Sequence, residues 1–259
     1  MEKKKIQVAG ISTAYVDRGS TGAPVAVVLH GWGANIESVF PIIQKLEQTH
    51  RVLAYDAPGH GDSEEPQEVF GTWDYAQFLL EFLETMDIHR ATFLGHSFGG
   101  KTLTIFAAEH PQRVDQLILV DASGVAPRRG ASYYIKVYRY KALRYLYEKF
   151  PLYKPSRERL QKFYARYGSD DYQNSSGIMR KIFVKVVNEN TDHYFPKIQA
   201  APLLIWGRWD DATPLYMAEV FEEKIPGSGL VILEGGHYSY LEDYGTFVAV
   251  LDSYLSPKQ

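Results

Sequence analysis

The chain has 259 residues, of which 45% are hydrophobic, a formal net charge of −3 at pH 7 and no cysteine. This slightly acidic balance does not favour nucleic-acid binding, and the lack of cysteine excludes disulfides and thiolate metal sites. The lysines of MEKKKIQVAGIST are not followed by the apolar stretch of a secretory signal. Because no apolar run is long enough to cross a bilayer either, we expect a cytoplasmic protein.

The predicted elements begin with a β-hairpin over residues 4–19. Short apolar runs rich in Val, Ile and Leu follow, as expected of strands that are covered on both faces. These runs lie at 24–30, 51–56, 91–95, 115–121, 201–207 and 229–235. Segments with helical spacing separate them, at about 36–48, 73–86, 98–109, 214–225 and 244–255. The alternation predicts an α/β fold with an eight-stranded, mostly parallel sheet and helices on both faces.

One interval between strands, residues 122–200, is too long for a single crossover helix. We therefore predict a helical cap inserted at 123–196, with 1–122 and 197–259 forming the core. Residues 125–170 contain twelve Lys or Arg, only three acidic residues, and many tyrosines. The simplest interpretation is a cap helix with a solvated basic face and a tyrosine-lined inner face. A preference for anionic substrates and a contact with an acidic membrane surface remain alternatives.

The stretch FLGHSFGGKT, residues 93–102, places Ser97 between a predicted strand and a predicted helix. In a parallel sheet ligands bind beyond the carboxyl ends of the strands, so this turn lies at the expected site. A sharp strand-to-helix turn would raise the Ser97 hydroxyl above the sheet, and Gly95 and Gly99 remove side chains that would clash with it. This Gly-x-Ser-x-Gly pattern in its strand–turn–helix context predicts a catalytic serine.

A serine hydroxyl needs an adjacent base, and the base needs a carboxylate to orient it. His237, in LEGGHYSYLEDY at the end of the last strand, is the predicted base. His96 is next to Ser97 in sequence, but the turn should direct its ring away from the hydroxyl. We predict that Asp210, after the strand APLLIWG, is the acid. Two alternatives fit less well: the adjacent Asp211, which we expect to face the other way, and Asp121, at the end of the preceding strand.

The oxyanion of a tetrahedral intermediate requires hydrogen-bond donors. The backbone N–H of Phe98 would start the helix after Ser97, where unpaired N–H groups meet the positive end of the helix dipole. The backbone N–H of Trp32, in His30-Gly31-Trp32-Gly33, is the second candidate, and its side chain would wall the acyl pocket. Alternatively, Trp32 is only a core aromatic residue in a loop.

Several motifs together make the chain resemble the α/β-hydrolase family over almost its whole length. They are HGWG (30–33), DAPGHGDS (56–63), GHSFGG (95–100), GRWDDATP (207–214) and GGHYSYLED (235–243). The resemblance implies the α/β-hydrolase fold and a triad in the order Ser97, Asp210, His237. A serine argues against the branches with an aspartate nucleophile, the epoxide hydrolases and haloalkane dehalogenases. Branches that cleave carbon–carbon bonds or form peracids also use serine and remain open.

We therefore predict a serine hydrolase that cleaves a carboxylic ester of a small to medium apolar or aromatic molecule through an acyl-enzyme. Trp32, Phe98, Trp209 and Tyr238 are expected to line its pocket. The mechanism needs no metal and no organic cofactor, and the expected partner is a small-molecule substrate rather than nucleic acid. A carbon–carbon hydrolase, a perhydrolase and a slow-turnover ligand receptor are the alternatives, and the oligomeric state does not follow from the sequence.

Overall fold

The computed structural model describes residues 2–128 and 175–256, together with the single positions 130, 135, 138, 139, 142 and 145. Most of the basic, tyrosine-rich part of the predicted cap therefore lies outside the described residues. The division into a core and a cap at 123–196 remains a prediction. Within those bounds the structure describes mainly residues 123–128 and 175–196.

The core is built on one eight-stranded sheet with the order β1-β2-β4-β3-β5-β6-β7-β8. The strands β3 to β8 are mutually parallel, whereas β1 and β2 form an antiparallel hairpin that joins the sheet through β4. The bounds are β1 (Lys4–Val8), β2 (Ile11–Arg18), β3 (Val25–Leu29), β4 (Arg51–Tyr55), β5 (Ala91–His96), β6 (Val114–Val120), β7 (Leu203–Gly207) and β8 (Gly229–Leu233). The predicted eight-stranded, mostly parallel sheet is confirmed.

The apolar runs form strands because both faces of the sheet are buried. In β3, Val27 and Leu29 belong to one hydrophobic core, while Ala26 and Val28 belong to a second core on the opposite face. Side chains of a strand alternate between the two faces, so a strand buried on both sides must be apolar at every position. The continuous apolar run is thus the direct signature of a central strand.

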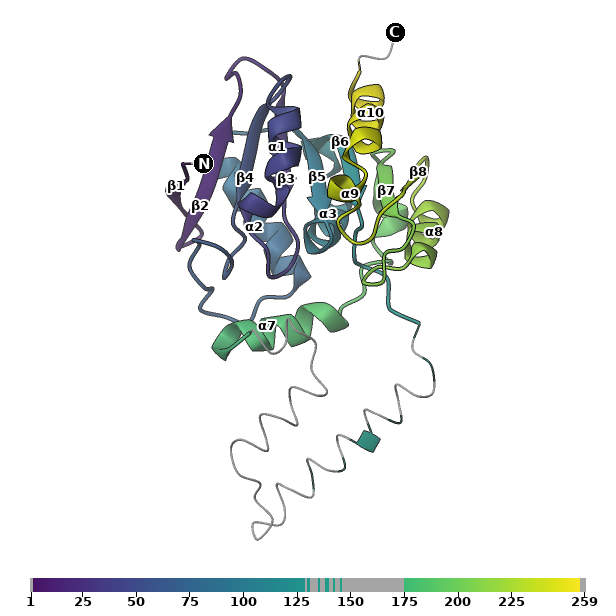
Figure 1. The fold of residues 1–259 in the computed structure, drawn as a ribbon. Coiled ribbons are helices and arrows are strands. Elements are labelled where there is room, and N and C mark those ends of the chain that lie inside the picture. The colour runs from purple at the N-terminus through teal and green to yellow at the C-terminus, as the bar shows by residue number, and fades with distance from the viewer. Residues whose placement is uncertain are drawn as a thin grey trace.

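Helices cover both faces of the sheet, as Figure 1 shows. One face is covered by α2 (Thr72–Thr85), α3 (Phe98–Glu109) and α8 (Leu215–Lys224), and the other by α1 (Phe40–Leu46) and α10 (Tyr244–Leu255). Short connecting elements are η1 (Ile36–Val39), η2 (Pro111–Arg113), η4 (Phe195–Lys197) and α9 (Ser239–Glu242). The helix expected at 36–48 is instead a 3₁₀ turn followed by α1, because Pro41 stands in the first turn of α1 and favours a new helix start.

Strand order places a crevice where the site was expected. The chain leaves β3 for β4 on one side and then returns to β5 on the other, so β3 is flanked by β4 and β5. The loops after β3 and β5 therefore diverge at the carboxyl edge, which is where open α/β sheets bind ligands. The helix α7 (Gly177–Asn188), from the end of the predicted cap, crosses this end of the molecule (Figure 1).

Candidate active site

Ser97 stands on the tight turn between β5 and α3 with φ 52° and ψ −113°. A residue with a side chain adopts such a positive φ only at a cost of about 1–3 kcal/mol, which the surrounding structure must offset. Close packing explains the flanking glycines: a Cβ at Gly95 would lie 2.6 Å from the backbone nitrogen of Gly100, and one at Gly99 would lie 2.5 Å from the carbonyl oxygen of Leu29. The sequence pattern therefore reflects a turn that only this arrangement of glycines permits.

The structure brings the three predicted catalytic side chains together. Nε2 of His237 lies 2.9 Å from Oγ of Ser97, and Nδ1 of the same ring lies 2.8 Å from Oδ2 of Asp210. With Nδ1–H donating to the carboxylate, Nε2 is free to accept the serine proton. This is the geometry that nucleophilic catalysis by a serine requires, with the base oriented by a third group.

Asp210 is buried, with 4% of its surface exposed, yet it is held as a carboxylate. Burial alone would raise its pKa, but hydrogen bonds from His237 and from Thr213 outweigh burial and hold the pKa of Asp210 below its usual value. Oδ1 accepts from the backbone N–H groups of Ala212 and Thr213, both at 2.8 Å. The loop after β7 therefore supplies both the acid and the donors that keep it ionised.

The base is tuned by the same carboxylate. Burial alone would lower the pKa of His237, but the hydrogen bond to Asp210 and its negative charge outweigh burial and raise the pKa above the usual value. A histidine with a raised pKa is a stronger proton acceptor, and its imidazolium form is stabilised when the serine loses its proton. Asp210 therefore both orients His237 and favours the charge that would develop on it.

The rival acids occupy other positions. Asp211 is exposed and faces solvent. Asp121 is fully buried, and its Oδ1 accepts from the backbone N–H of Gly207 at 2.7 Å and its Oδ2 from the hydroxyl of Ser239 at 2.7 Å. Burial raises the pKa of Asp121 to about 7. Asp121 thus ties the loops after β7 and β8 together, while Asp210 is the carboxylate that reaches the histidine.

His96 is a buried brace rather than a base, as expected from the turn geometry. Its Nε2–H donates to the backbone carbonyl of His237 at 2.7 Å, and burial lowers its pKa to about 3, so the ring is neutral. His30 plays a comparable part in the neighbouring loop: its Nδ1–H donates to the carbonyl of Gly31 and its Nε2 accepts from the N–H of Ala57. Both rings hold the loops that surround Ser97.

The two predicted oxyanion donors lie beside the nucleophile. Phe98 is the first residue of α3, and the loop containing Trp32 approaches so closely that a Cβ at Gly31 would lie 3.3 Å from Cβ of Ser97. Within the described ranges, the backbone N–H groups of Trp32 and Phe98 donate no hydrogen bond to the protein. Two adjacent N–H donors without protein acceptors are what an oxyanion site requires, and their assignment to this role is a proposal.

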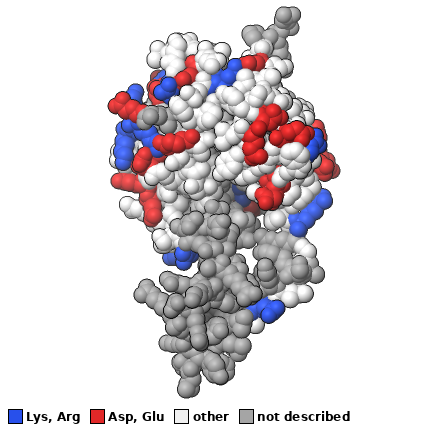
Figure 2. Space-filling model, in the orientation of Figure 1, with Lys and Arg blue, Asp and Glu red and all other residues white. Residues whose placement is uncertain are grey.

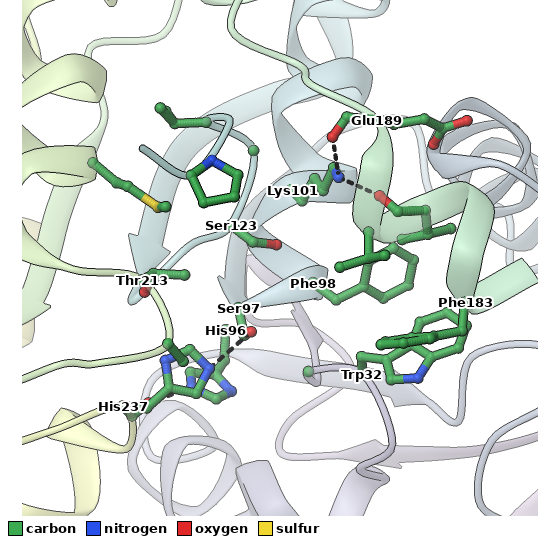
Figure 3. Close-up of a pocket in the computed structure, with 18 of the residues that line it drawn as sticks. Trp32, His96, Ser97, Phe98, Lys101, Ser123, Phe183, Glu189, Thr213 and His237 are labelled. Atoms are coloured by element: carbon green, nitrogen blue, oxygen red, sulfur yellow. Dashed lines mark hydrogen bonds between the residues drawn. The ribbon is translucent and has the colours of Figure 1, made fainter. Parts of the chain in front are cut away.

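Ser97 opens onto a cavity of about 340 Å³ between the strand ends and α7. Trp32, Phe98 and Tyr238 line it, as predicted, and Phe183 of α7 packs against Trp32 with 5.5 Å between ring centroids (Figure 3). The prediction for Trp209 is wrong. Its side chain is 65% exposed and does not line the cavity, because the loop turns Asp210 inward and leaves its neighbour Trp209 facing solvent.

Sequence reasoning missed several cavity residues. Phe183 and Val186 come from α7, which has no motif, and Met217 comes from α8. Lys101 could have been found, because it lies one helical turn after Ser97 and must therefore be on the same side of α3. The others could not, because only the tertiary position of α7 brings them over the strand ends.

The match to a family model agrees with this geometry. The model of the alpha/beta hydrolase fold matches residues 24–244, so the chain belongs to this family. The poly(3-hydroxyalkanoate) depolymerase of Ectopseudomonas oleovorans is 26% identical to it over 218 residues, which cover 82% of this chain and 77% of that protein. The monoacylglycerol lipase abhd6-B of Xenopus laevis is 23% identical over 287 residues, which cover 100% of this chain and 83% of that protein.

Solved structures lead to the same class. An esterase from Exiguobacterium antarcticum has a TM-score of 0.74 and 25% sequence identity, covering 99% of this chain and 100% of that one. The chain is therefore an enzyme of the hydrolase class. No helix within residues 2–128 and 175–256 has the length and apolar character to cross a membrane. The same ranges contain no cluster of three His, Asp or Glu side chains placed to hold a metal ion.

Proposed function

We propose that the protein is a serine hydrolase that cleaves carboxylic esters through a Ser97–His237–Asp210 triad. The observation that carries the proposal is the continuous hydrogen-bonded chain from Oγ of Ser97 through His237 to Asp210, which opens onto the cavity. Relatives named as a lipase and an esterase support an ester as the substrate. The aromatic rings of Trp32, Phe98 and Phe183 along the cavity favour an apolar or aromatic group next to the ester.

In the proposed mechanism Oγ of Ser97 attacks the ester carbonyl while Nε2 of His237 takes its proton. The negative charge that forms on the carbonyl oxygen accepts hydrogen bonds from the N–H groups of Trp32 and Phe98. His237 then donates the proton to the leaving alkoxide, which departs as an alcohol and leaves an acyl-enzyme. Water attacks this ester with His237 again as base, and the acid and free Ser97 are released. Asp210 stabilises the imidazolium in both steps.

Labelling with a fluorophosphonate tests the assignment of the nucleophile. The wild-type protein should be labelled, and Ser97→Ala should not, because the probe forms a covalent bond only with an activated serine. Ser123→Ala is the matched control, since Ser123 also lines the cavity and its loss should leave the label in place. A label on Ser97→Ala protein at the wild-type rate would refute the triad.

An ester panel tests the reaction itself. Butyl esters of acids from two to eight carbons should be hydrolysed by the wild-type protein and not by Ser97→Ala. If Ser97 is labelled but no ester in the panel is cleaved, the nucleophile assignment stands and the ester reaction is wrong. A dienolic diketone, the type of substrate cleaved by carbon–carbon hydrolases, belongs in the same assay because that alternative uses the same serine.

The charge of the described surface bears on the proposed partners. On the face shown in Figure 2, acidic and basic side chains of the core are interspersed and form no broad basic area. This distribution supports a small-molecule substrate over nucleic acid, which requires an extended positive surface. The basic segment at 125–170 lies almost wholly outside the described residues. Arg128, which the structure does describe, packs over the ring of Tyr216 at 4.4 Å from its centroid.

A further inference from the structure

Lys101 is a buried lysine inside the active-site cavity that the proposed mechanism does not use. It lies one turn along α3 from Ser97, and its backbone N–H donates to the carbonyl of Ser97 at 3.0 Å. Only 4% of its surface is exposed, and it lines the same cavity as Ser97. Lysine is almost never fully buried without a partner, so its surroundings need an explanation.

The ammonium group holds the C-terminal end of α7. Nζ donates to the carbonyl oxygens of Val186 at 2.6 Å and Glu189 at 2.7 Å, as Figure 3 shows. The negative end of the α7 dipole favours a cation at this place, which accounts for part of the stabilisation of the charge. Lys101 therefore connects the helix that carries the nucleophile to the cap helix that covers the cavity.

Within the described ranges, no carboxylate oxygen accepts a hydrogen bond from this ammonium group, although the negative charge of Glu189 acts on it from a distance. Glu189 is the nearest candidate, but its side chain faces α2 instead, where it accepts from the backbone N–H and the hydroxyl of Thr72, both at 2.7 Å. Lys101 therefore contacts Glu189 only through the backbone carbonyl. Burial lowers the pKa of Lys101 to about 8, and the negative charge of Glu189 offsets this effect only in part.

Among the described residues, the ammonium group of Lys101 has acceptors for two of its three hydrogen-bond donors. Lysine has three N–H groups, and two of them meet the carbonyls of Val186 and Glu189. The third meets no acceptor in the part of the chain that the structure describes. Because Lys101 lines the cavity, a carboxylate oxygen in the cavity could accept this bond and neutralise the charge. Charge-assisted hydrogen bonds of this kind are roughly twice as strong as neutral ones.

We propose that Lys101 binds a carboxylate of the substrate, so that the preferred esters carry an acid group near the scissile bond. The aromatic rings of Trp32, Phe98 and Phe183 would contact the apolar part of such a molecule, and Lys101 its anionic end. Ser97 directly precedes α3, and Lys101 follows it by four residues, about 6 Å along a helix. Both side chains line the same cavity, so one molecule can contact both. This inference rests on the proposed function and specifies its substrate class.

The test compares acidic and neutral esters of equal length. In the first pair, monobutyl glutarate carries a carboxylate in its acyl part, and butyl hexanoate is its neutral counterpart. In the second pair, the butanoyl ester of 4-hydroxybutanoate carries the carboxylate in its alcohol part, and pentyl butanoate is the neutral counterpart. In at least one pair kcat/KM for the acid should exceed that for the neutral ester. Lys101→Met should lower this ratio about tenfold or more, the loss expected for one charged hydrogen bond. If the wild-type protein shows no preference for the acid in either pair, or Lys101→Met leaves the ratio unchanged, Lys101 only fastens α7 and the proposal is wrong.

Matched variants separate recognition from folding. Lys185→Met removes a positive charge from α7 itself, outside the cavity lining, and should leave the ratio as in the wild type. If Lys101→Met does not fold, Lys101→Gln keeps N–H donors for the α7 carbonyls but lacks the charge, and should show the same fall. In the wild type the ratio should decrease as the pH rises through about 8, where Lys101 loses its charge. A ratio that is constant from pH 6 to pH 9.5 would contradict the proposal.

Binding without turnover distinguishes this proposal from the proposed function. The thermal stability of Ser97→Ala protein should rise with monobutyl glutarate, or with the alcohol-side acid, more than with the neutral esters. This difference should vanish in the Ser97→Ala/Lys101→Met protein. If no ester is hydrolysed but the difference in stability is found, the carboxylate site stands and the esterase function fails. If esters are hydrolysed and no difference is found, the carboxylate site fails and the esterase function stands.

Discussion

The cavity has two unlike sides. On the side of Ser97, two buried carboxyl groups have hydrogen-bond partners: Asp210 accepts from His237, Ala212 and Thr213, and Asp121 accepts from Gly207 and Ser239. The opposite side, formed by α7 and the start of α3, presents the rings of Phe98 and Phe183 together with Lys101 and Glu189. The side of Ser97 is therefore preorganised for proton transfer between protein groups, whereas the other side is suited to contacts with a bound molecule.

Asp210→Asn is expected to produce the largest effect, because it removes the partner that holds the tautomer and stabilises the imidazolium. The same substitution in another Ser-His-Asp triad lowers kcat about 10⁴-fold, and we expect a loss of this order in ester hydrolysis. Asp211→Asn is the matched control and should stay near the wild-type rate, since Asp211 faces solvent. Equal losses in the two variants would show that the carboxylate pairing is not as the structure has it.

Gly99→Ala should destabilise the folded protein through a clash next to Ser97, because the new Cβ would lie 2.5 Å from the carbonyl oxygen of Leu29. Backbone atoms cannot move away cheaply, so we expect the free energy of unfolding in urea to fall by about 3 kcal/mol. Gly245→Ala, in a helix and with no atom within 4 Å of the added Cβ, should leave it unchanged or slightly higher. Similar stabilities for both variants would mean that β3 and α3 are not so closely packed.

The pH dependence of kcat/KM reports on His237. Only the neutral ring can accept the Ser97 proton, so activity should fall about tenfold per pH unit below the pKa of His237. Because Asp210 raises this pKa, the midpoint should lie above that of an ordinary histidine. In Asp210→Asn the residual activity should have its midpoint at lower pH, since the stabilising charge is gone. If the midpoint of the Asp210→Asn profile equals that of the wild type, the pH dependence does not come from His237.

Phe183→Ala is expected to have the smallest effect, which should be confined to the side of the cavity that α7 forms. The ring packs against Trp32 and lines the cavity, so its loss should raise KM for apolar esters about tenfold and change kcat little. Val184→Ala alters the next residue of α7, which is 44% exposed, and should change neither constant. A fall in kcat comparable to that of Asp210→Asn would mean that the two sides are not functionally distinct.

Much of the core could be predicted because its signals are local. A strand buried on both faces must be apolar throughout, and the tight turn at Ser97 requires glycine at positions 95 and 99. Both features can therefore be recognised in a short stretch of sequence. The structure then places Ser97, His237 and Asp210 within hydrogen-bonding distance. The direction of a loop side chain depends on the rest of the fold rather than on neighbouring residues. For this reason the prediction that Trp209 lines the cavity was wrong.

The α/β alternation, the sharp turn at Ser97 and the residue types at each strand end follow from the sequence alone. The folded arrangement was needed to show that Asp210 rather than Asp121 reaches His237, that Trp209 faces solvent, and that Lys101 is buried beneath α7. The physical reason is distance along the chain. Periodicity and turn chemistry act over a few residues, whereas the charge balance of a cavity depends on elements such as α3 and α7 that meet only in the folded protein.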